Sequence, residues 1–118
     1  MIDWRTIDTV LLDMDGTLLD LHFDNHFWQH HLPRRYAEHH GLDPSLAMAD
    51  LYQRFDDWRG TIQWYCTDFW SRQLDLDIVA LKHEVKHLIA ERPQVREFLA
   101  QLGHSGRRRV LITNAHRD

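Results

Sequence analysis

Two short apolar runs, far apart in the chain, set the strongest limit on how this sequence can fold. Thr9–Leu12 leads into an acidic, glycine-containing loop, and Val110–Thr113 lies near the other end. Short apolar runs bounded by turns are typical of strands buried on both faces of a parallel sheet. Between them the sequence has helical periodicity. The order strand, helices, helix, strand therefore predicts an α/β fold built on part of a doubly wound sheet.

The intervening helices can be placed from their start and stop signals. We expect a first helix from about Asp24, interrupted at Pro33, and a second that begins at Asp43–Pro44 and ends at Gly60. A last helix should open at Pro93 and stop at Gly103 and Gly106. The apolar faces repeat every three or four residues. They are Met48, Leu51, Tyr52, Phe55 and Trp58; Ile62, Tyr65, Cys66 and Phe69; Ile78, Leu81, Val85 and Leu88; and Val95, Phe98, Leu99 and Leu102.

The aromatic residues indicate two domains. Eleven of the 13 lie between Phe23 and Trp70, which predicts a central segment with its own core. We therefore assign residues 1–20 and 91–118 to a partial α/β core and residues 21–90 to an inserted helical domain.

Charge and cysteine content exclude several classes of protein. The chain has 14 basic and 18 acidic residues, so it lacks the positive charge that nucleic-acid binding needs. No apolar stretch is long enough for a membrane helix, and the first residues do not resemble a signal peptide. A single cysteine, Cys66, suits a reducing compartment. We expect a soluble, cytoplasmic protein with no nucleic-acid or membrane partner; its oligomeric state stays open.

The loop after the first apolar run carries the clearest chemical signal. Asp13 and Asp15 are two apart at the carboxyl end of the expected strand, where α/β sheets bind ligands, and Gly16 lets the backbone turn away. Two close carboxylates repel each other unless a cation compensates, and Mg²⁺ prefers oxygen ligands and often accompanies phosphate. A carboxylate can also attack phosphorus and form an aspartyl-phosphate. The alternative, an acidic loop that only caps a helix, explains less of the pattern.

This string, Asp-Met-Asp-Gly-Thr, resembles the first motif of the haloacid dehalogenase-like (HAD) hydrolases, which are mostly phosphatases. Further likeness to their bacterial GMP/IMP nucleotidase branch comes from LLDMDGTLLDLHFDNHFW at Leu11–Trp28, from Trp64–Cys66, and from Thr113–His116. The resemblance implies a Rossmannoid core with a helical cap inserted after the first motif. The core would bind phosphate, and the cap would close over the nucleoside.

The resemblance also implies roles for individual residues. Asp13 would be the nucleophile and an Mg²⁺ ligand; Asp15 would be the general acid and base and would touch the metal through its carbonyl oxygen. Thr113 and Asn114 match the second motif, which binds phosphate. An acid two residues after the nucleophile favours loss of an alkoxide over loss of a halide, because an alkoxide benefits from a proton donor.

The family's third motif supplies a lysine and its fourth supplies acidic metal ligands, and neither is found here. Lys82 and Lys86 lie on an expected cap helix instead. We therefore expect only the N-terminal part of such an enzyme, truncated after the second strand. The first hypothesis is a Mg²⁺-dependent phosphohydrolase acting on purine 5′-nucleotides, GMP or IMP. The alternatives are a catalytically silent fragment of such an enzyme, or a HAD phosphatase acting on a sugar phosphate.

Histidine patterns offer rival hypotheses. His83–His87 matches the His-Glu-x-x-His pattern of zinc proteases, but Ala90 and Pro93 stand where its extended form needs Gly and His. We interpret it as a chance match on a solvated helix. Other histidines are clustered at positions 26, 30, 31, 39 and 40, and we expect exposed helix surface there. We expect Cys66 to be a small core residue.

Overall fold

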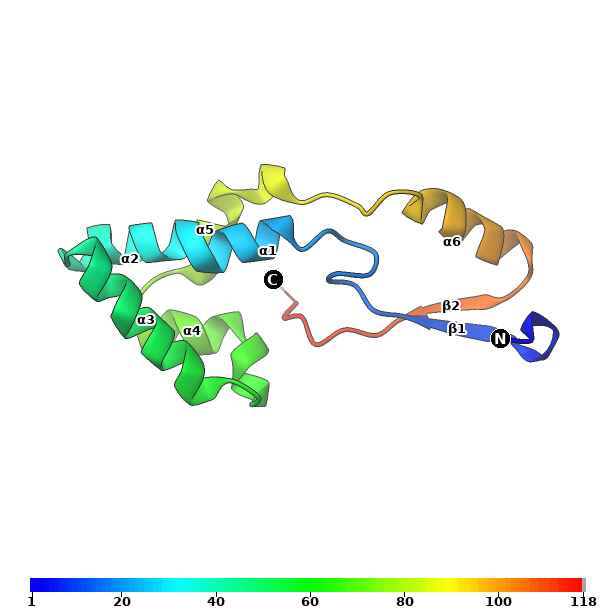
Figure 1. Cartoon of the computed structure of the whole chain (residues 1–118), viewed down its shortest axis with the longest axis horizontal. Helices are drawn as coiled ribbons and strands as arrows, with labels where there is room; N and C mark the ends of the chain where they lie inside the picture. Colours follow the sequence, from blue (N-terminus) through cyan, green and yellow to red (C-terminus); the bar gives the residue numbers. More distant parts are fainter. Residues whose placement is uncertain (118) are drawn as a thin grey trace. The chain divides into compact units, whose positions relative to one another are not determined.

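The structure is a computed structural model that describes residues 1–117, and it divides into two compact units (Figure 1). The first unit consists of Met1–Leu21 and Ile89–Thr113. The second consists of His22–Leu88 together with the chain from Asn114 onward. Within residues 1–117 there is no helix of sufficient length and apolarity to cross a membrane.

The first unit is a small α/β unit with two parallel strands. It contains a 3-10 turn (Trp4–Thr6), β1 (Thr9–Leu12), α6 (Val95–His104) and β2 (Arg108–Leu111). The strands pair from Thr9 opposite Arg108 to Leu12 opposite Leu111. The parallel pairing and the connecting helix confirm the α/β fold class that the sequence predicts.

The second strand begins earlier than the apolar run indicates. β2 starts at Arg108, two residues before Val110, because its backbone already pairs there with β1 and the exposed strand tolerates arginine side chains. Beyond Leu111, the Ile112 N–H still donates to the Leu12 carbonyl oxygen at 2.8 Å. Burial on both faces, expected from the apolar runs, is not observed among the described residues. Leu11 is 61% exposed and Leu111 is 52% exposed.

The second unit is helical throughout the residues that the structure describes, apart from its turns and the segment after Asn114. Its α-helices are α1 (His22–His26), α2 (Leu32–His40), α3 (Pro44–Trp58), α4 (Thr67–Leu74) and α5 (Ile78–Glu84). Shorter turns connect them: a π-helical turn at Phe27–His31 and 3-10 turns at Ile62–Tyr65 and Lys86–Leu88. The predicted start of α3 is confirmed, since the Asp43 carboxylate accepts the N–H groups of Ser45 and Leu46.

The sequence favours a break or a kink at Pro33, and the structure shows a continuous helical path with a wide turn directly before the proline. The Leu32 N–H donates to the Phe27 carbonyl, five residues back, and Pro33 then lies in the first turn of α2. Proline has no N–H and is tolerated at a helix start, where that donor would have no intrahelical acceptor. The helical path therefore continues from His22 to His40 with one π-helical turn inside it.

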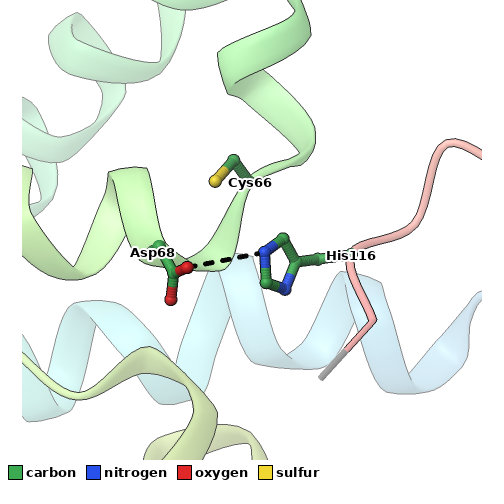
Figure 2. A group of neighbouring side chains, drawn as sticks. All are labelled: Cys66, Asp68 and His116. Carbon is green, nitrogen blue, oxygen red and sulfur yellow. Dashed lines mark ion pairs between the residues drawn. The ribbon is translucent and has the colours of Figure 1, made fainter.

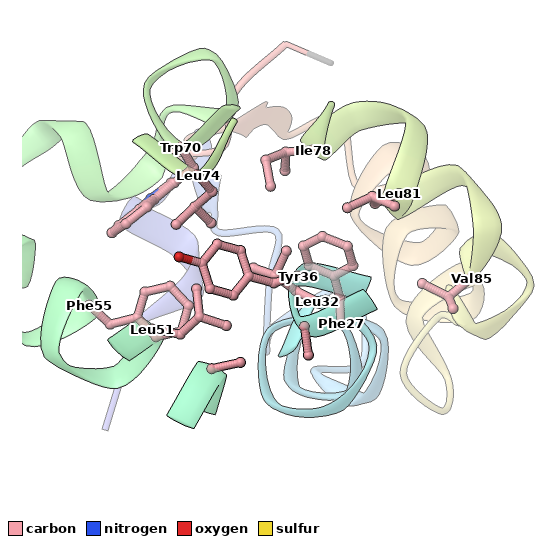
Figure 3. Close-up of a cluster of buried hydrophobic side chains, with 12 residues drawn as sticks. Phe27, Leu32, Tyr36, Leu51, Phe55, Trp70, Leu74, Ile78, Leu81 and Val85 are labelled. Carbon is pink, nitrogen blue, oxygen red and sulfur yellow. The ribbon is translucent and has the colours of Figure 1, made fainter. Parts of the chain in front are cut away.

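A single aromatic and aliphatic cluster fills the helical unit (Figure 3). Trp70 belongs to this cluster, and its ring is edge-on to Phe55 and Phe69, at centroid distances of 5.2 Å in both cases. The Trp70 indole N–H donates to the Trp64 carbonyl at 3.0 Å, so its polar atom is satisfied. The largest fully buried side chains are Trp70, Phe27, Leu32, Leu51, Leu74 and Ile78.

Several expected helical faces are corrected by the structure. Tyr52 is 44% exposed, because α3 turns Ala47, Leu51 and Phe55 inward instead. Ile62 and Tyr65 are exposed on a 3-10 turn that precedes α4.

Cys66 and the last helix also differ from expectation. Cys66 is half-buried and caps α4 by accepting the Phe69 N–H on its sulfur at 3.4 Å, so it is not a core residue within a helix. In the first unit, α6 starts at Val95 rather than Pro93, and Gln94 precedes it in the left-handed region. The helix then continues through Gly103 and ends at His104.

Candidate active site

Parallel pairing brings Asp13 and Thr113 to the same end of the two strands. Asp13 directly follows β1, and Thr113 lies one residue beyond the Ile112 N–H that bonds to Leu12. In a parallel pair the carboxyl ends of both strands meet at one edge, where α/β sheets bind ligands. Both residues are exposed to solvent. The Asp13 carboxylate and the Thr113 hydroxyl are therefore both exposed beyond the carboxyl ends of two paired strands.

The loop after Asp13 is a tight turn held by its own backbone. The Met14 carbonyl accepts the N–H groups of Leu18 and Leu19, each at 2.9 Å, and the Gly16 N–H donates to the Leu19 carbonyl at 2.8 Å. Gly16 has φ +79°, and a Cβ there would lie 3.3 Å from the Leu21 side chain. Glycine is needed for both reasons, because the left-handed region and the close approach each disfavour a side chain.

The same loop is tied to the segment that returns from the helical unit. The Asp20 N–H donates to the Ala90 carbonyl at 2.8 Å, and the Arg92 N–H donates to the Leu18 carbonyl at 3.0 Å. This pair of backbone hydrogen bonds joins residues about seventy apart in sequence. The position of Asp15, within the turn, is therefore fixed from both sides by backbone bonds.

Asp13 and Asp15 have the chemistry of a hard-cation site. Both carboxylates are exposed, and oxygen ligands of this kind are what Mg²⁺ prefers. Asp15 also lies in the bridge with Leu19 that shapes the turn. Asn114, the second predicted phosphate ligand, follows Thr113 in the chain but belongs to the helical unit. The structure thus groups Asp13, Asp15 and Thr113 in one unit and assigns Asn114 to the other.

The His-Glu-x-x-His string does not lie on one helix. His83 and Glu84 end α5, whereas His87 lies in the following 3-10 turn, and both histidines are exposed. Glu84 instead contacts the buried His31, with Nε2 and Oε2 2.8 Å apart, and accepts a bond from Arg35 at 3.2 Å. The expected single helix over this string is therefore wrong, and the interpretation of the string as a chance match stays a prediction.

The other clustered histidines have structural contacts. His40 Nε2 lies 2.8 Å from the Leu74 carbonyl oxygen and so links α2 to the end of α4. The rings of His22, His26 and His30 follow one another along the first helix at centroid distances of 6.0 and 5.6 Å. Partial burial, and then the positive charge of His30 and His22, lower the pKa of His26 from its ordinary value of 6.5.

The sequence analysis did not predict one group of potential metal ligands. Cys66, Asp68 and His116 bring a sulfur, a carboxylate oxygen and an imidazole nitrogen to within 4.8 Å of one another (Figure 2). Cys66 and Asp68 lie two residues apart in the chain, but His116 follows β2. Its distance along the sequence from the other two matches no metal-binding pattern that we recognised. Only the folded chain brings the three together.

Known proteins resemble this chain in sequence and in fold. No family model matches it. It is 48% identical over 115 residues to the proteins named GMP/IMP nucleotidase YrfG from Escherichia coli K12 and from Shigella flexneri. The match covers 98% of this chain and 52% of each relative, so the chain spans about half the length of the curated relatives it matches.

A solved structure has the same fold. The HAD phosphatase from Thermococcus onnurineus superposes with a TM-score of 0.78 over 94% of this chain and 53% of that protein, at 20% sequence identity. The chain is thus similar in sequence to proteins named GMP/IMP nucleotidase, and it shares the fold of a protein named HAD phosphatase. The resemblance seen in the Asp13–Thr17 motif is thereby confirmed, and so is the HAD-like Rossmannoid fold class with additional helices. The matching proteins are named as a nucleotidase and a phosphatase, both of which are hydrolases.

Proposed function

We propose that this chain contributes the nucleophile and part of the phosphate site of a phosphomonoester hydrolase. The observation that carries the proposal is the position of Asp13 and Asp15 after β1, with Thr113 after the neighbouring parallel strand. Relatives named as a nucleotidase support the same activity. The roles of these residues are the proposal's content and are what the experiment tests.

The chemistry proceeds in two steps. An Asp13 carboxylate oxygen attacks phosphorus, the bond to the ester oxygen breaks, and Asp15, protonated, donates its proton to the departing alkoxide. A water molecule then attacks the phosphorus of the aspartyl-phosphate and gives a proton to Asp15. Inorganic phosphate leaves and Asp13 is restored. The Thr113 hydroxyl and Asn114 amide donate hydrogen bonds to the phosphoryl oxygens, whose charge must be stabilised in the transition state.

The Asp13 carboxylate and the Asp15 backbone carbonyl are the groups that would hold Mg²⁺. Their donor atoms are oxygens at an open sheet edge, which suits a hard cation. The cation would neutralise phosphoryl charge and orient the phosphate. This chain's contribution is a rigid turn, fixed by the Met14 and Leu19 carbonyls, that holds both acidic residues in place.

The names of the relatives support one substrate class. Because they are named GMP/IMP nucleotidases and share 48% of the aligned residues, we propose purine 5′-monophosphates as substrates. By contrast, residues 1–21 and 89–113 contain no lysine, the residue type that neutralises phosphate in this family. We therefore expect the 118-residue chain by itself to be catalytically silent.

The test restores a complete enzyme around this chain. A chimera in which the 118 residues replace the matching half of the Escherichia coli relative is assayed for phosphate release from GMP, IMP and a sugar phosphate with Mg²⁺. We expect turnover of GMP and IMP that Asp13→Asn abolishes, because an amide cannot attack phosphorus. Asp15→Asn should lower kcat by about 10²–10⁴ through loss of proton transfer.

Asp8→Asn is the matched control, since Asp8 is exposed just before β1 and pairs with β2 only through its backbone carbonyl. It should leave turnover unchanged. Near-normal hydrolysis by the Asp13→Asn chimera would refute the proposed nucleophile, and a preference for the sugar phosphate would refute the substrate class. Turnover by the isolated chain would show that it needs no further lysine.

A further inference from the structure

A three-residue cluster in the helical unit combines the donor types that bind zinc. Cys66 is the residue before α4, Asp68 lies in the first turn of that helix, and His116 comes from the segment after β2. Their ligand atoms all lie within 4.8 Å of one another, and Figure 2 shows the His116 ring directed toward Cys66 and Asp68. One cation could therefore reach all three with small side-chain adjustments.

The His116 ring is oriented by a buried hydroxyl. Its Nδ1 lies 3.0 Å from the Oγ1 of Thr67, a residue only 4% exposed, whereas its Nε2 lies 3.7 Å from Asp68 Oδ2. When Nδ1–H donates to Thr67, the lone pair resides on Nε2, which is the nitrogen that faces the carboxylate. Metal-bound histidines are generally held this way, with the second ring nitrogen bonded to a fixed acceptor.

The Cys66 sulfur is held in place by the helix it caps. Sγ accepts the Phe69 N–H at 3.4 Å, and this bond fixes the sulfur at the start of α4. Cys66 and His116 are half-buried, while the Asp68 side chain is 64% exposed. Two of the three ligands are thus held by other contacts, and the exposed Asp68 side chain is free to adjust.

We propose that Cys66, Asp68 and His116 bind a zinc ion. Sulfur and imidazole nitrogen are soft and borderline donors that suit Zn²⁺, whereas Mg²⁺ selects oxygen donors, so this site and the Asp13 site differ in metal preference. The bound ion would join His116 to Cys66 and Asp68, which lie far from it in the sequence, and Thr67 already contacts His116 across a separation of 49 residues. It therefore stabilises the folded helical unit over the unfolded chain. The site is independent of the phosphatase proposal.

Cobalt and zinc serve as the probes, on the reduced, untagged 118-residue chain. We expect one equivalent of Co²⁺ to give a thiolate-to-metal charge-transfer absorption band, Zn²⁺ to displace it, and excess Mg²⁺ to leave it unchanged. Cys66→Ser should remove the band, because serine keeps the helix cap but supplies no thiolate. Zn²⁺ should also raise the Tm of the wild-type chain and not that of Cys66→Ser.

Two further variants separate binding from folding. Asp68→Asn alters an exposed side chain and should weaken Zn²⁺ binding without changing circular dichroism. Thr67→Val should weaken it by about 10- to 100-fold, the loss seen when a partner that orients a histidine ligand is removed.

Two control variants test whether other histidines bind the metal instead. The double variants His83→Ala/His87→Ala and His22→Ala/His26→Ala should retain the one-equivalent site. A Co²⁺ complex without the thiolate band, a band that persists in Cys66→Ser, or no binding to the folded chain would each overturn the proposal. The cluster would then be an ion pair between Asp68 and His116 beside a capping cysteine.

Discussion

The two units of this protein differ sharply in how much of their own apolar surface they bury. In the helical unit, Phe27, Leu51, Trp70 and Ile78 are almost completely inaccessible. In the α/β unit, only Leu12 and Leu102 are buried among the described residues, at 9% and 6% exposure. Folding free energy from apolar burial is therefore concentrated in the helical unit.

The α/β unit, by contrast, carries the proposed catalytic groups on a sheet with an open face. Leu11, Leu111 and Ile112 are all more than half exposed, which is unusual for strands with such apolar sequences. An apolar face of this kind invites association with other chains. The comparison indicates that the proposed catalytic motif and most of the buried apolar surface of this chain lie in different units, so mutations can address them separately.

The largest change in stability should come from truncating Trp70, a buried side chain of the helical unit. Trp70→Ala removes a side chain that is 1% exposed and edge-on to Phe55 and Phe69. We expect the free energy of unfolding to fall by about 3–5 kcal/mol, as for other buried aromatic truncations. Urea unfolding followed by circular dichroism measures it. Ile62→Ala, at a residue 73% exposed, is the control and should change stability by less than about 0.5 kcal/mol.

The start of α3 should contribute a smaller amount. Asp43 accepts the Ser45 N–H at 2.9 Å and the Leu46 N–H at 3.3 Å, so Asp43→Ala leaves both donors to water. We expect a loss of about 1 kcal/mol, while Asp43→Ser should retain most of the capping. Chemical denaturation of the three proteins measures the differences. Equal stability of the alanine and serine variants would contradict the capping role.

At the start of α6, in the α/β unit, a substitution should raise stability instead of lowering it. Gln94 precedes α6 with φ +66° and no side-chain cap, a conformation that costs a residue with a Cβ about 1–2 kcal/mol. Gln94→Gly removes that cost but adds backbone entropy to the unfolded chain, so we expect a net gain of about 0.5 kcal/mol. Hydrogen exchange at α6 amides should slow in the variant. Faster exchange there would disprove the argument.

The smallest effect concerns pH. The pKa of His26 is lowered by partial burial and by His30, His22, His31 and His87, so the unfolded chain binds this proton more readily than the folded one. Stability from this group is therefore present above about pH 6.5 and is lost as the pH falls through the lower folded pKa. NMR titration should place its midpoint below 6.5. His30→Gln should raise that midpoint, and His104→Gln, on α6, should not.

Much of the fold could be predicted because its signals are local. Asp43 and Pro44 mark the start of α3, and Thr9–Leu12 is the first strand. The errors arise where tertiary contacts decide. Tyr52 fits the apolar spacing of α3, yet it is exposed, and α3 instead buries Ala47 and Leu51 against the other helices.

The candidate site shows the same division. Asp13 and Asp15 could be found because they lie two residues apart in the sequence and come directly after a strand. The cluster of Cys66, Asp68 and His116 could not be found, because a cysteine that caps a helix looks like a core residue in the sequence. Its third member comes from beyond β2, and only the folded structure brings it near.

The paired backbone bonds at Asp20–Ala90 and Leu18–Arg92 have a consequence for modularity. They hold the two ends of the intervening seventy or so residues side by side, so that segment begins and ends at one place on the α/β unit. Closing a flexible loop costs only about 0.6 kcal/mol more for each doubling of its length. The entropic cost of joining the two ends of the inserted segment therefore depends only weakly on its length, while the turn that carries Asp13 and Asp15 is held by its own backbone bonds.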